Sequence, residues 1–487
     1  MSDNSRRKFL QQYLMVMAIP VIPTIIAMPA LAATMAPAEN LEDKKRRMIK
    51  QRRKAKEGGS FDWAEMDKLR NKIIAPTFPN RDFLITEFGA KANHDNGSAL
   101  TNSNAIKSAI EACHNAGGGR VVIKGGVFKS AAIHLKSNVN LHIEKGATIA
   151  FSTTFDDYLP VVFTRLGGTE CMTRSPLIYA YQQTNIAITG EGVLDGMASE
   201  DNWWGFVGAD PEKGSDSAKI LEQMAIDNVP VSQRIFEKNN FFRPPFIQPY
   251  ECENVLIEGV TLHRGPAWMI NPVLCKNVTV NKVTIDSWGY NNDGCDPESC
   301  ENVLIEHCDF TCKDDGVAIK SGKNADGRRV NVPSRNIIVA NCVMNTRHTA
   351  VAIGSEMTGG VENVYIENIT GGKIQRAFRI KTNSLRGGFA RNIGFRNSTV
   401  KEATGVLIDI KTSYGREIGE FYPEITNINI ENVACKHAVK AISMMGTTDI
   451  PINNVALKNI KVAKSEDKSV FNHVTGFTFE KVSIDFG

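Results

Sequence analysis

The sequence has little net charge, no glycine period and no series of long apolar segments, and each absence excludes a class of protein. Its 487 residues carry a formal charge of only +4. Residues 1–57 hold twelve Lys/Arg and five Asp/Glu, which leaves 45 and 48 for residues 58–487, a nearly neutral body. Charge therefore gives no reason to expect a nucleic-acid partner. The 39 glycines show no Gly-X-Y period, which excludes collagen, and a composition of 42% hydrophobic and 23% charged residues excludes a disordered chain or a polytopic membrane protein.

The N-terminus has the pattern of an export signal. The pair Arg6-Arg7 precedes an uncharged run over residues 9–38, which contains Pro20, Pro23 and the small-residue stretch Pro29-Ala30-Leu31-Ala32-Ala33. This pattern is typical of a twin-arginine signal peptide spanning residues 1–33, and it predicts a periplasmic or secreted protein. The alternative is a membrane anchor, which the prolines disfavour. No cysteine precedes Cys113, which excludes a lipoprotein anchor, so we expect no stable membrane anchor after cleavage.

The rest of the chain is predicted to consist of two parts. Residues 34–79 are interpreted as a basic arm or linker, because nine Lys/Arg fall between residues 44 and 56; a tether to a membrane surface or polyanion is the alternative. Residues 80–487 form one predicted domain. Most of the ten cysteines lie among apolar strand residues, which favours buried, unpaired side chains, with a Cys295–Cys312 disulfide left open.

A repeated phrase, Asn-apolar-x-apolar-x-x-apolar-x-apolar, predicts the fold. Its steps vary from 23 to 35 residues, and the copies start at Asn254, Asn277, Asn302, Asn336, Asn363, Asn392, Asn427 and Asn454, with earlier relatives at Asn138 and Asn185. Each copy alternates with a period of two, and turn residues and a second short strand follow. This predicts an all-β, single-stranded right-handed parallel β-helix. The asparagines are expected to stack as a ladder whose amides bond the next coil's backbone. A leucine-rich repeat is disfavoured because the copies lack regular leucines and a helix.

The open end of a solenoid exposes strand edges and needs a cap. Residues 101–116 predict a short N-terminal capping helix that Gly117-Gly118-Gly119 ends. The apolar face of this helix is expected to contain Ala105, Ile106, Ala109, Ile110 and Cys113. Residues 197–246 lack the repeat and are interpreted as a long loop beside one end of a groove.

Three acidic residues stand in consecutive coils where a strand gives way to a turn. Asp293 lies in YNNDGCDP, and Asp314 and Asp315 lie in CKDDGVAIKSG. Neighbouring coils stack ~4.8 Å apart, so these acids can project from one face. They can therefore reach the separation of ~6.5–9.5 Å that inverting glycosidases use, and crowding of like charges would raise one pKa. Asp296 is interpreted as a turn-stabilising residue, because Pro297 follows it.

Basic residues follow the acids. His348 lies in NTRHTAVAIGSE, and Arg379 and Lys381 share one face of a predicted strand in FRIKTNSLRGG. A guanidinium beside an ammonium suits a carboxylate, so the combination predicts an acidic sugar polymer as substrate. Trp203 and Trp204 would stack on a sugar or pack on the body. Weaker candidates for lining the groove are Tyr414, Arg376, Arg386, Lys320 and Lys323.

Four motifs in this order resemble those of glycoside hydrolase family 28, the polygalacturonases, in which N-T-D, D-D, G-H-G and R-I-K stand on a right-handed β-helix. Here they are Asn291-Asn292-Asp293, Asp314-Asp315, Arg347-His348-Thr349 and Arg379-Ile380-Lys381. The resemblance covers residues 80–460, and the stretch RIKTN-x-x-RGG is similar to exo-acting members. It implies inverting hydrolysis of α-1,4-galacturonosyl bonds in polygalacturonate or its oligomers. Asp314 would be the general acid, Asp293 and Asp315 would position and activate the water, and His348 would tune the protonation of the acid or touch the leaving sugar.

The resemblance also implies that Arg379 and Lys381 bind the substrate carboxylate, with no metal and no cofactor. Asn291 and Tyr414 are further predicted substrate contacts. Arg347 and Thr349 replace the glycines beside His348, so the subsite is expected to differ in shape. Arg347 is predicted to contact the anion, with a narrower cleft as the alternative. We expect a monomer whose partner is an acidic polysaccharide or oligosaccharide.

Three alternatives remain open at this stage. A rhamnogalacturonan hydrolase is less favoured because His348 and the R-I-K motif resemble the galacturonan branch. A β-elimination lyase on the same fold would need a basic residue as catalyst and, in most cases, calcium held by acids. A non-catalytic solenoid that binds polysaccharide is disfavoured by the complete set of acids.

Overall fold

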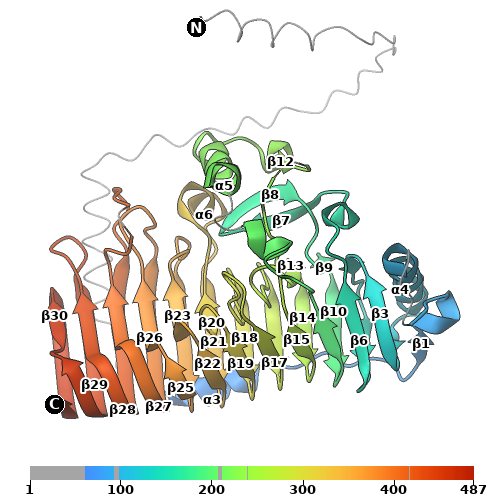
Figure 1. Ribbon diagram of the computed structural model, residues 1–487. Coiled ribbons are helices and arrows are strands. Elements are labelled where there is room, and N and C mark those ends of the chain that lie inside the picture. Colours follow the sequence, from blue (N-terminus) through green and yellow to red (C-terminus); the bar gives the residue numbers. More distant parts are fainter. Residues whose placement is uncertain (1–60, 93–97, 207–210, 239, 416, 487) are drawn as a thin grey trace, which may run out of the picture. The chain divides into compact units, whose positions relative to one another are not determined.

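Parallel strands stacked coil upon coil make up most of the chain (Figure 1). The computed structural model describes residues 61–92, 98–206, 211–238, 240–415 and 417–486. The predicted signal peptide and the basic run of the predicted arm lie outside the described residues. No helix within the described part of the chain has the length and apolarity to cross a membrane.

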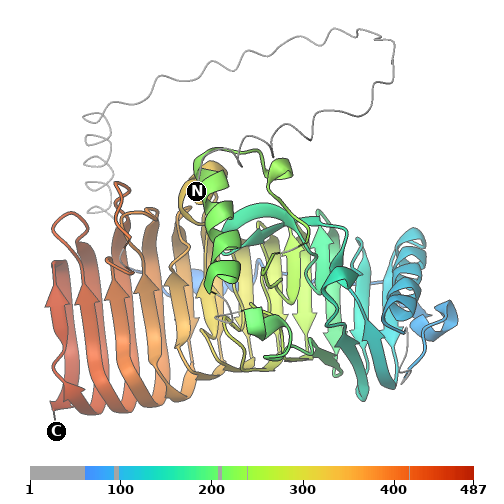
Figure 2. The ribbon, with the colours of Figure 1, turned by 45° about the horizontal axis from the view of Figure 1, so that its top comes forward.

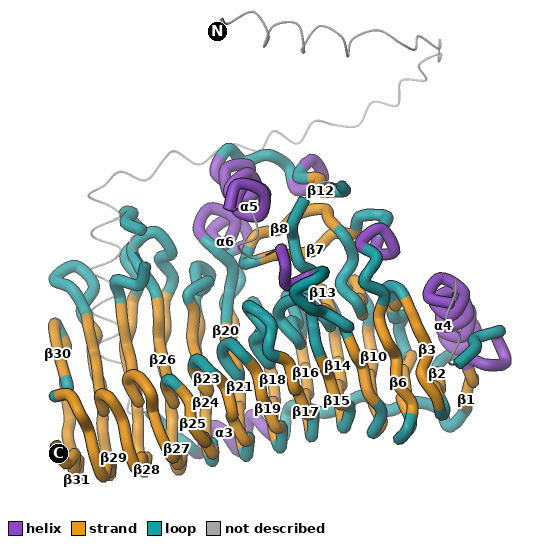
Figure 3. Tube along the Cα trace, viewed as in Figure 1, coloured by secondary structure: helices purple, strands orange, loops and turns teal. Residues whose placement is uncertain are grey.

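The strands form three parallel rows, one strand of each row per coil, as predicted for a right-handed β-helix (Figure 3). The first row comprises β1 (Asp82–Leu84), β2 (Gly119–Ile123), β5 (Val139–Ile143), β10 (Thr184–Gly190), β14 (Glu253–Glu258), β16 (Lys276–Asn281), β18 (Glu301–Glu306), β21 (Ser334–Ala340) and β24 (Val361–Glu367). The second row comprises β3 (Gly126–Ser130), β6 (Ala147–Phe151), β11 (Val193–Asp195), β15 (Thr261–His263), β17 (Thr284–Ser287), β19 (Asp309–Cys312), β22 (Val343–Thr346) and β25 (Thr370–Ile374).

The third row carries the predicted basic motif. It comprises β4 (Ile133–His134), β9 (Ile178–Tyr181), β13 (Ile247–Tyr250), β20 (Val317–Ile319), β23 (Thr349–Gly354), β26 (Arg376–Lys381) and β30 (Val470–Asn472). Single bridges at Ile270 and Cys295 continue this row between β13 and β20. Towards the C-terminus, longer strands run through more than one row: β27 (Phe389–Lys411), β28 (Glu424–Met445), β29 (Ile452–Asp467) and β31 (Val474–Phe486).

The repeated asparagines form the predicted ladder, with a different hydrogen-bond partner. All are in the left-handed region, as Asn302 is with φ 60°, which asparagine tolerates better than other residues with a side chain. The amide of Asn302 donates to the side-chain oxygen of Asn277 (3.2 Å), and that of Asn336 donates to Asn302 (3.1 Å). The prediction of bonds to the next coil's backbone was therefore wrong. A second ladder, which includes Asn341 and Asn368, was not predicted.

The core lies between the rows and is filled by the alternating apolar residues of each copy. Val303 and Ile305 point inward and are fully buried, as their counterparts are in neighbouring coils. All ten cysteines are buried and free, which confirms the preferred interpretation and gives no Cys295–Cys312 disulfide.

A helix closes the N-terminal end of the stack. The capping helix is α4 (Ser98–Asn115), and its predicted apolar face is buried in the core of the solenoid. Three consecutive glycines with positive φ follow it. A Cβ at Gly118 would lie 2.6 Å from the carbonyl oxygen of Asn138, so this turn needs glycine.

The described part of the predicted linker belongs to the solenoid. Helix α3 (Ala64–Arg70) buries Met66 and Leu69 on outward-facing apolar residues of the first row, including Leu304 and Ile338. The repeat puts its middle apolar residue on the outside of the coil, and α3 covers these residues over three coils. The interpretation of residues 34–79 as a linker is therefore wrong over residues 61–73, because these outward positions are too apolar to be left in water.

Excursions from the coils stand beside the third row (Figure 2). They include the antiparallel pair β7 (Val162–Leu166) and β8 (Thr169–Thr173), with β12 (Ile235–Phe236) alongside, and the helices α5 (Pro211–Ile226) and α6 (Asn324–Val330). Residues 197–246 are thus not simply a long loop. Ser217, Leu221 and Ala225 are buried at helical spacing, a period that the search for strand repeats missed. The 3-10 turns are η1 (Ile85–Phe88), η2 (Phe155–Tyr158), η3 (Trp203–Phe206) and η4 (Val231–Gln233).

Buried ion pairs hold these excursions together. Arg165 of β7 contacts Glu170 of β8 (3.0 Å) and Glu298 of the solenoid (3.4 Å), and all three side chains are buried. Arg234 contacts Asp326 of α6 at 2.7 Å. Removing one partner of such a pair would leave an uncompensated buried charge, so the network fixes these segments over the third row.

Candidate active site

The three predicted acids come together because parallel register repeats their position from coil to coil. Cys295, Val317 and Val351 pair in sequence along the third row, so the residues two positions earlier, Asp293, Asp315 and Thr349, occupy one column. The backbone confirms this stacking: the amide of Gly294 donates to the carbonyl of Asp315 (2.9 Å), and that of Gly316 donates to Thr349 (2.8 Å).

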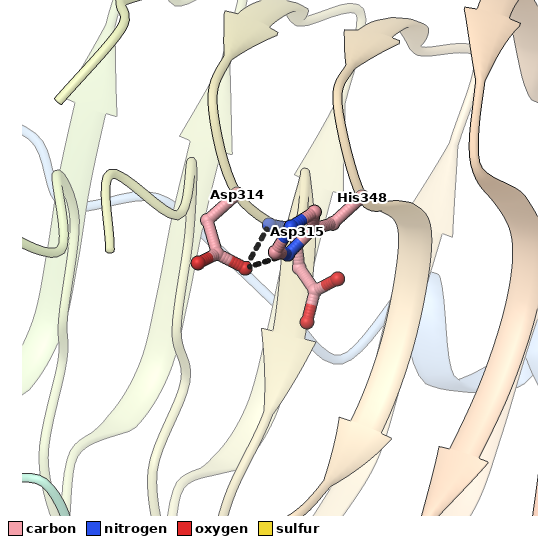
Figure 4. Close-up of side chains that lie close together, drawn as sticks. All are labelled: Asp314, Asp315 and His348. Atoms are coloured by element: carbon pink, nitrogen blue, oxygen red, sulfur yellow. Dashed lines mark hydrogen bonds and ion pairs between the residues drawn. The ribbon is translucent and has the colours of Figure 1, made fainter. Parts of the chain in front are cut away.

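Asp314 faces His348 of the next coil (Figure 4). The imidazole Nδ1 lies 2.8 Å from Asp314 Oδ1, and this hydrogen bond raises the pKa of His348. The His348 side chain is 47% exposed and that of Asp314 is 18% exposed. Asp314 is therefore the member of the acid group that an entering substrate can reach most directly.

Asp315 is buried and held as a carboxylate. Its Oδ2 lies 2.8 Å from Nζ of Lys381, and its Oδ1 accepts a hydrogen bond from the amide of Thr349 (2.9 Å). Burial opposes ionisation, yet the charge and hydrogen bond of Lys381 outweigh it and hold the pKa of Asp315 well below its ordinary value. Lys381 thus serves an internal carboxylate, whereas the sequence predicted that it binds the substrate's.

Asp293 is in the opposite electrostatic state. Burial, together with the nearby charge of Asp314, raises its pKa to about 7. The buried ammonium of Lys320 lies 3.6 Å from Asp293, 3.4 Å from Asp296 and 3.4 Å from Glu356, and this ammonium limits the rise. The crowding predicted from the sequence therefore acts most clearly on Asp293.

Asp296 belongs to this cluster. Its carboxyl is fully buried, and burial followed by the charge of Asp293 raises the pKa of Asp296 well above its ordinary value. Its interpretation as a turn-stabilising residue was wrong, because the turn directs it inward next to Asp293 and Lys320. Glu356 also belongs to this cluster and was not predicted. Burial raises the pKa of Glu356, but the charge of Lys320 outweighs burial and lowers that pKa to about 2.

Arg379 and Lys381 lie on the same face of β26, as predicted. The Nε of Arg379 lies 3.0 Å from Asp409 of the next coil, which also contacts Arg376 at 3.1 Å. The ring of Tyr414 lies 5.2 Å from the Arg379 guanidinium and 5.7 Å from the Lys381 ammonium. Tyr414 is therefore placed beside the cations, as its predicted role in the groove requires.

The other predicted contacts surround this group. Asn291 accepts a hydrogen bond from Arg243 (2.6 Å), and Arg347 is exposed. Asn292, which replaces threonine in the motif, donates to the carbonyls of Gly265 and Ala267 (both 3.0 Å) and is buried. It fastens the Asp293 turn to the preceding coil.

Neither Trp203 nor Trp204 is placed to stack on a sugar ring. Trp203 is fully buried in an aromatic group with Phe155 and Tyr158. The Nε1 of Trp204 donates to the carbonyl of Gly265 (2.9 Å), and its ring lies under the backbone of Gly289. Both pack on the body, which was the second of the two interpretations.

An open pocket of about 360 Å³ adjoins the acids on the side of the excursions. Asn291, Trp268 and Glu356 line its floor, and the walls come from the β7–β8 turn, α5 and residues 241–245. Lys320 links pocket and acids, because its ammonium lies 4.5 Å from the Trp268 ring centre and contacts Asp293 and Glu356. Burial lowers the pKa of the lining residue Arg243 to about 10, while Asp293 and Asp314 favour its charged form.

One group of potential metal ligands exists among the described residues, formed by Asp314, Asp315 and His348, whose ligand atoms lie within 4.8 Å of one another. Lys381 neutralises Asp315, and His348 bonds Asp314. These potential ligands are thus engaged in internal pairs.

A solenoid that holds crowded acids, one of them kept ionised, beside an open pocket has the carboxyl groups that hydrolysis of a glycosidic bond uses. The chain matches the model of glycosyl hydrolases family 28 over residues 233–483 and belongs to that family. It is therefore a glycoside hydrolase.

Similar proteins point in the same direction. The crystal structure of a hyperthermoactive exopolygalacturonase from Thermotoga maritima is 36% identical, with a TM-score of 0.81, and the match covers 85% of this chain and 95% of that one. An exo-poly-alpha-D-galacturonosidase of Dickeya chrysanthemi is 26% identical over 436 residues, 80% of this chain and 70% of that protein. A probable polygalacturonase of Vitis vinifera is 25% identical over 396 residues, 78% and 73% respectively.

Proposed function

We propose that this enzyme hydrolyses α-1,4-galacturonosyl bonds of polygalacturonate or its oligomers by an inverting mechanism, and that it acts from the chain end. The observation that carries the proposal is the separation of roles among three adjacent acids. Asp314 reaches the surface, Asp315 is held ionised by Lys381, and burial favours the protonated form of Asp293.

The chemistry follows from these states. Asp314, oriented by His348, gives its proton to the glycosidic oxygen as the bond from that oxygen to the anomeric carbon breaks. Water attacks the anomeric carbon from the opposite face, and the ionised Asp315, with Asp293 beside it, takes the water's proton. The products are free galacturonate with inverted anomeric configuration and a chain that is one residue shorter and ends in a free hydroxyl.

Action at the chain end is supported by the pocket. Its walls at α5 and the β7–β8 turn stand on one side of the acids, where the groove of an endo-acting enzyme would have to stay open. Arg243 lines this pocket and supplies a cation for the carboxylate of a terminal uronate. The names of the Thermotoga and Dickeya relatives, both exo-acting, add support.

The proposal is tested with purified residues 34–487 on polygalacturonate and on galacturonate oligomers. Reducing ends, ultraviolet absorbance and product sizes are followed together. We expect reducing ends without absorbance and monomer as the first product. Products that absorb ultraviolet light would show β-elimination, and a ladder of oligomers would show endo action. Turnover of rhamnogalacturonan alone would show that rhamnogalacturonan is the substrate.

We also propose export by the twin-arginine route, on the strength of Arg6-Arg7 and the small residues ending at Ala33. Replacing both arginines with lysine should retain the precursor inside the cell. Unchanged export of that variant would show that another route is used.

A further inference from the structure

Three strand ends in register lie next to the catalytic acids. Ser287, Cys312 and Thr346 are in register at the ends of β17, β19 and β22. The amide of Lys313 donates to the carbonyl of Ser287 (3.1 Å), and that of Arg347 donates to Cys312 (3.1 Å). The residues that follow these strand ends, namely Trp288, Lys313 and Arg347, therefore occupy successive coils, ~4.8 Å apart.

In the column formed by Trp288, Lys313 and Arg347, the first and last side chains are exposed and that of Lys313 is half-buried. Trp288 is 49% exposed, and Tyr290 of the same turn is 40% exposed. The ammonium of Lys313 lies 3.4 Å from the centre of the Tyr290 ring, a cation–π contact that joins two coils. Arg347 is exposed in the third coil. Aromatic faces pack against the apolar faces of sugars, and the cations suit carboxylates, so the column combines both groups needed to hold a uronate chain.

The column is continuous with both the acids and the pocket. Lys313 and Arg347 directly precede Asp314 and His348 in the sequence. Arg243 of the pocket wall donates to the backbone carbonyl of Tyr290 and to the side chain of Asn291. When the end of a galacturonate chain lies in the pocket and its scissile bond lies at Asp314, the chain thus passes beside this column.

We propose that Trp288, Tyr290, Lys313 and Arg347 form an accessory subsite that binds uronate residues beyond the two that flank the scissile bond. The proposal rests on the proposed function and deepens it, because it assigns a preference for longer chains. Each further residue held by the column adds affinity, until the three coils are occupied.

The test measures binding separately from turnover. Full-length Asp314→Asn protein is titrated calorimetrically with galacturonate dimer, trimer and tetramer, alone and combined with Lys313→Ala or Trp288→Ala. We expect the tetramer-to-dimer affinity ratio of the parent to fall about fivefold or more in each combination. Lys276→Ala, which removes an exposed lysine from the first row, serves as the matched control and should leave the ratio unchanged.

The outcomes are distinct. Unfolding temperatures of all variants establish that they are folded. An unchanged ratio in both combinations would overturn the accessory subsite while leaving galacturonan hydrolysis intact. A fall in dimer and tetramer affinity by the same factor would also overturn it, because the column would then act at the scissile bond. Failure of the parent to bind any galacturonate oligomer, with no hydrolysis by the wild-type chain, would instead overturn the proposed function.

Discussion

The acids of this enzyme differ in protonation because each has different immediate neighbours. Lys381 and the Thr349 amide stabilise the charge of Asp315, whereas Asp293 lies buried against Asp296 and Asp314 with a shared ammonium. Asp314 accepts a hydrogen bond from the amide of Asp315 (2.9 Å) and contacts the partly exposed imidazole of His348. Side chains of one type can therefore hold their protons with different strength at one pH.

Replacing Lys381 with methionine should uncouple this arrangement. Lys381 holds the pKa of Asp315 low, so its loss raises that pKa, and the carboxylate is protonated at pH values where the wild-type group is charged. The acid limb of the pH profile of kcat/KM should move to higher pH, and kcat should fall by about 10²-fold or more. Steady-state rates between pH 3 and 8 measure both effects.

The control is Lys373→Met, which removes an exposed lysine paired with Glu402. It should leave the profile in place. An acid limb that stays fixed in Lys381→Met, with only KM increased, would show that Lys381 binds substrate and does not ionise Asp315.

At the scale of the element, the coils depend on asparagine for two reasons. An asparagine with positive φ stands near the start of each first-row strand from β10 to β24, and its side-chain amide bonds the asparagine of the preceding coil. Glycine would satisfy the backbone alone, and other polar residues would satisfy neither condition well. These two requirements explain why asparagine recurs in every copy of the repeat in the sequence, although the loops between the copies differ in length.

Replacing Asn302 with alanine should destabilise the protein by about 2–4 kcal/mol, because it introduces left-handed strain and removes two ladder bonds. Asn302→Gly removes the bonds without strain and should cost about half as much. Denaturant unfolding of the two variants measures the difference. Equal losses would show that backbone conformation contributes nothing and that only the amide matters.

The sequence predicts the elements that depend on local patterns, but not those that depend on contacts between coils. Copies such as NVLIEGVTL predict the strands and the order of the coils, because the alternation of apolar and polar residues lies within each copy. The four motifs predict which acids and cations gather. Helix α3 and the position of Asp296 were not predicted, because both depend on what other coils present. Outward apolar residues of three coils bind α3, and the buried ammonium of Lys320 lies beside Asp296.

At the scale of the whole molecule, a solenoid assembles its site by stacking. Residues from Asp293 to Tyr414 are far apart in sequence but stand in neighbouring coils, each displaced by one strand spacing. Insertions leave the stack undisturbed, so α5, α6 and the β7–β8 pair could be added over the third row. Buried pairs such as Arg165–Glu298 fix them there, and the resulting wall turns a groove into a pocket.

The central claim, that the stacked acids hydrolyse the substrate, is tested most directly by one rate. The value of kcat for galacturonate oligomers is compared between wild type, Asp314→Asn and Asp286→Asn, an exposed aspartate of β17. The account predicts a loss of about 10³-fold or more in Asp314→Asn, with unchanged folding, and a wild-type rate in Asp286→Asn. Wild-type turnover by folded Asp314→Asn protein would contradict it.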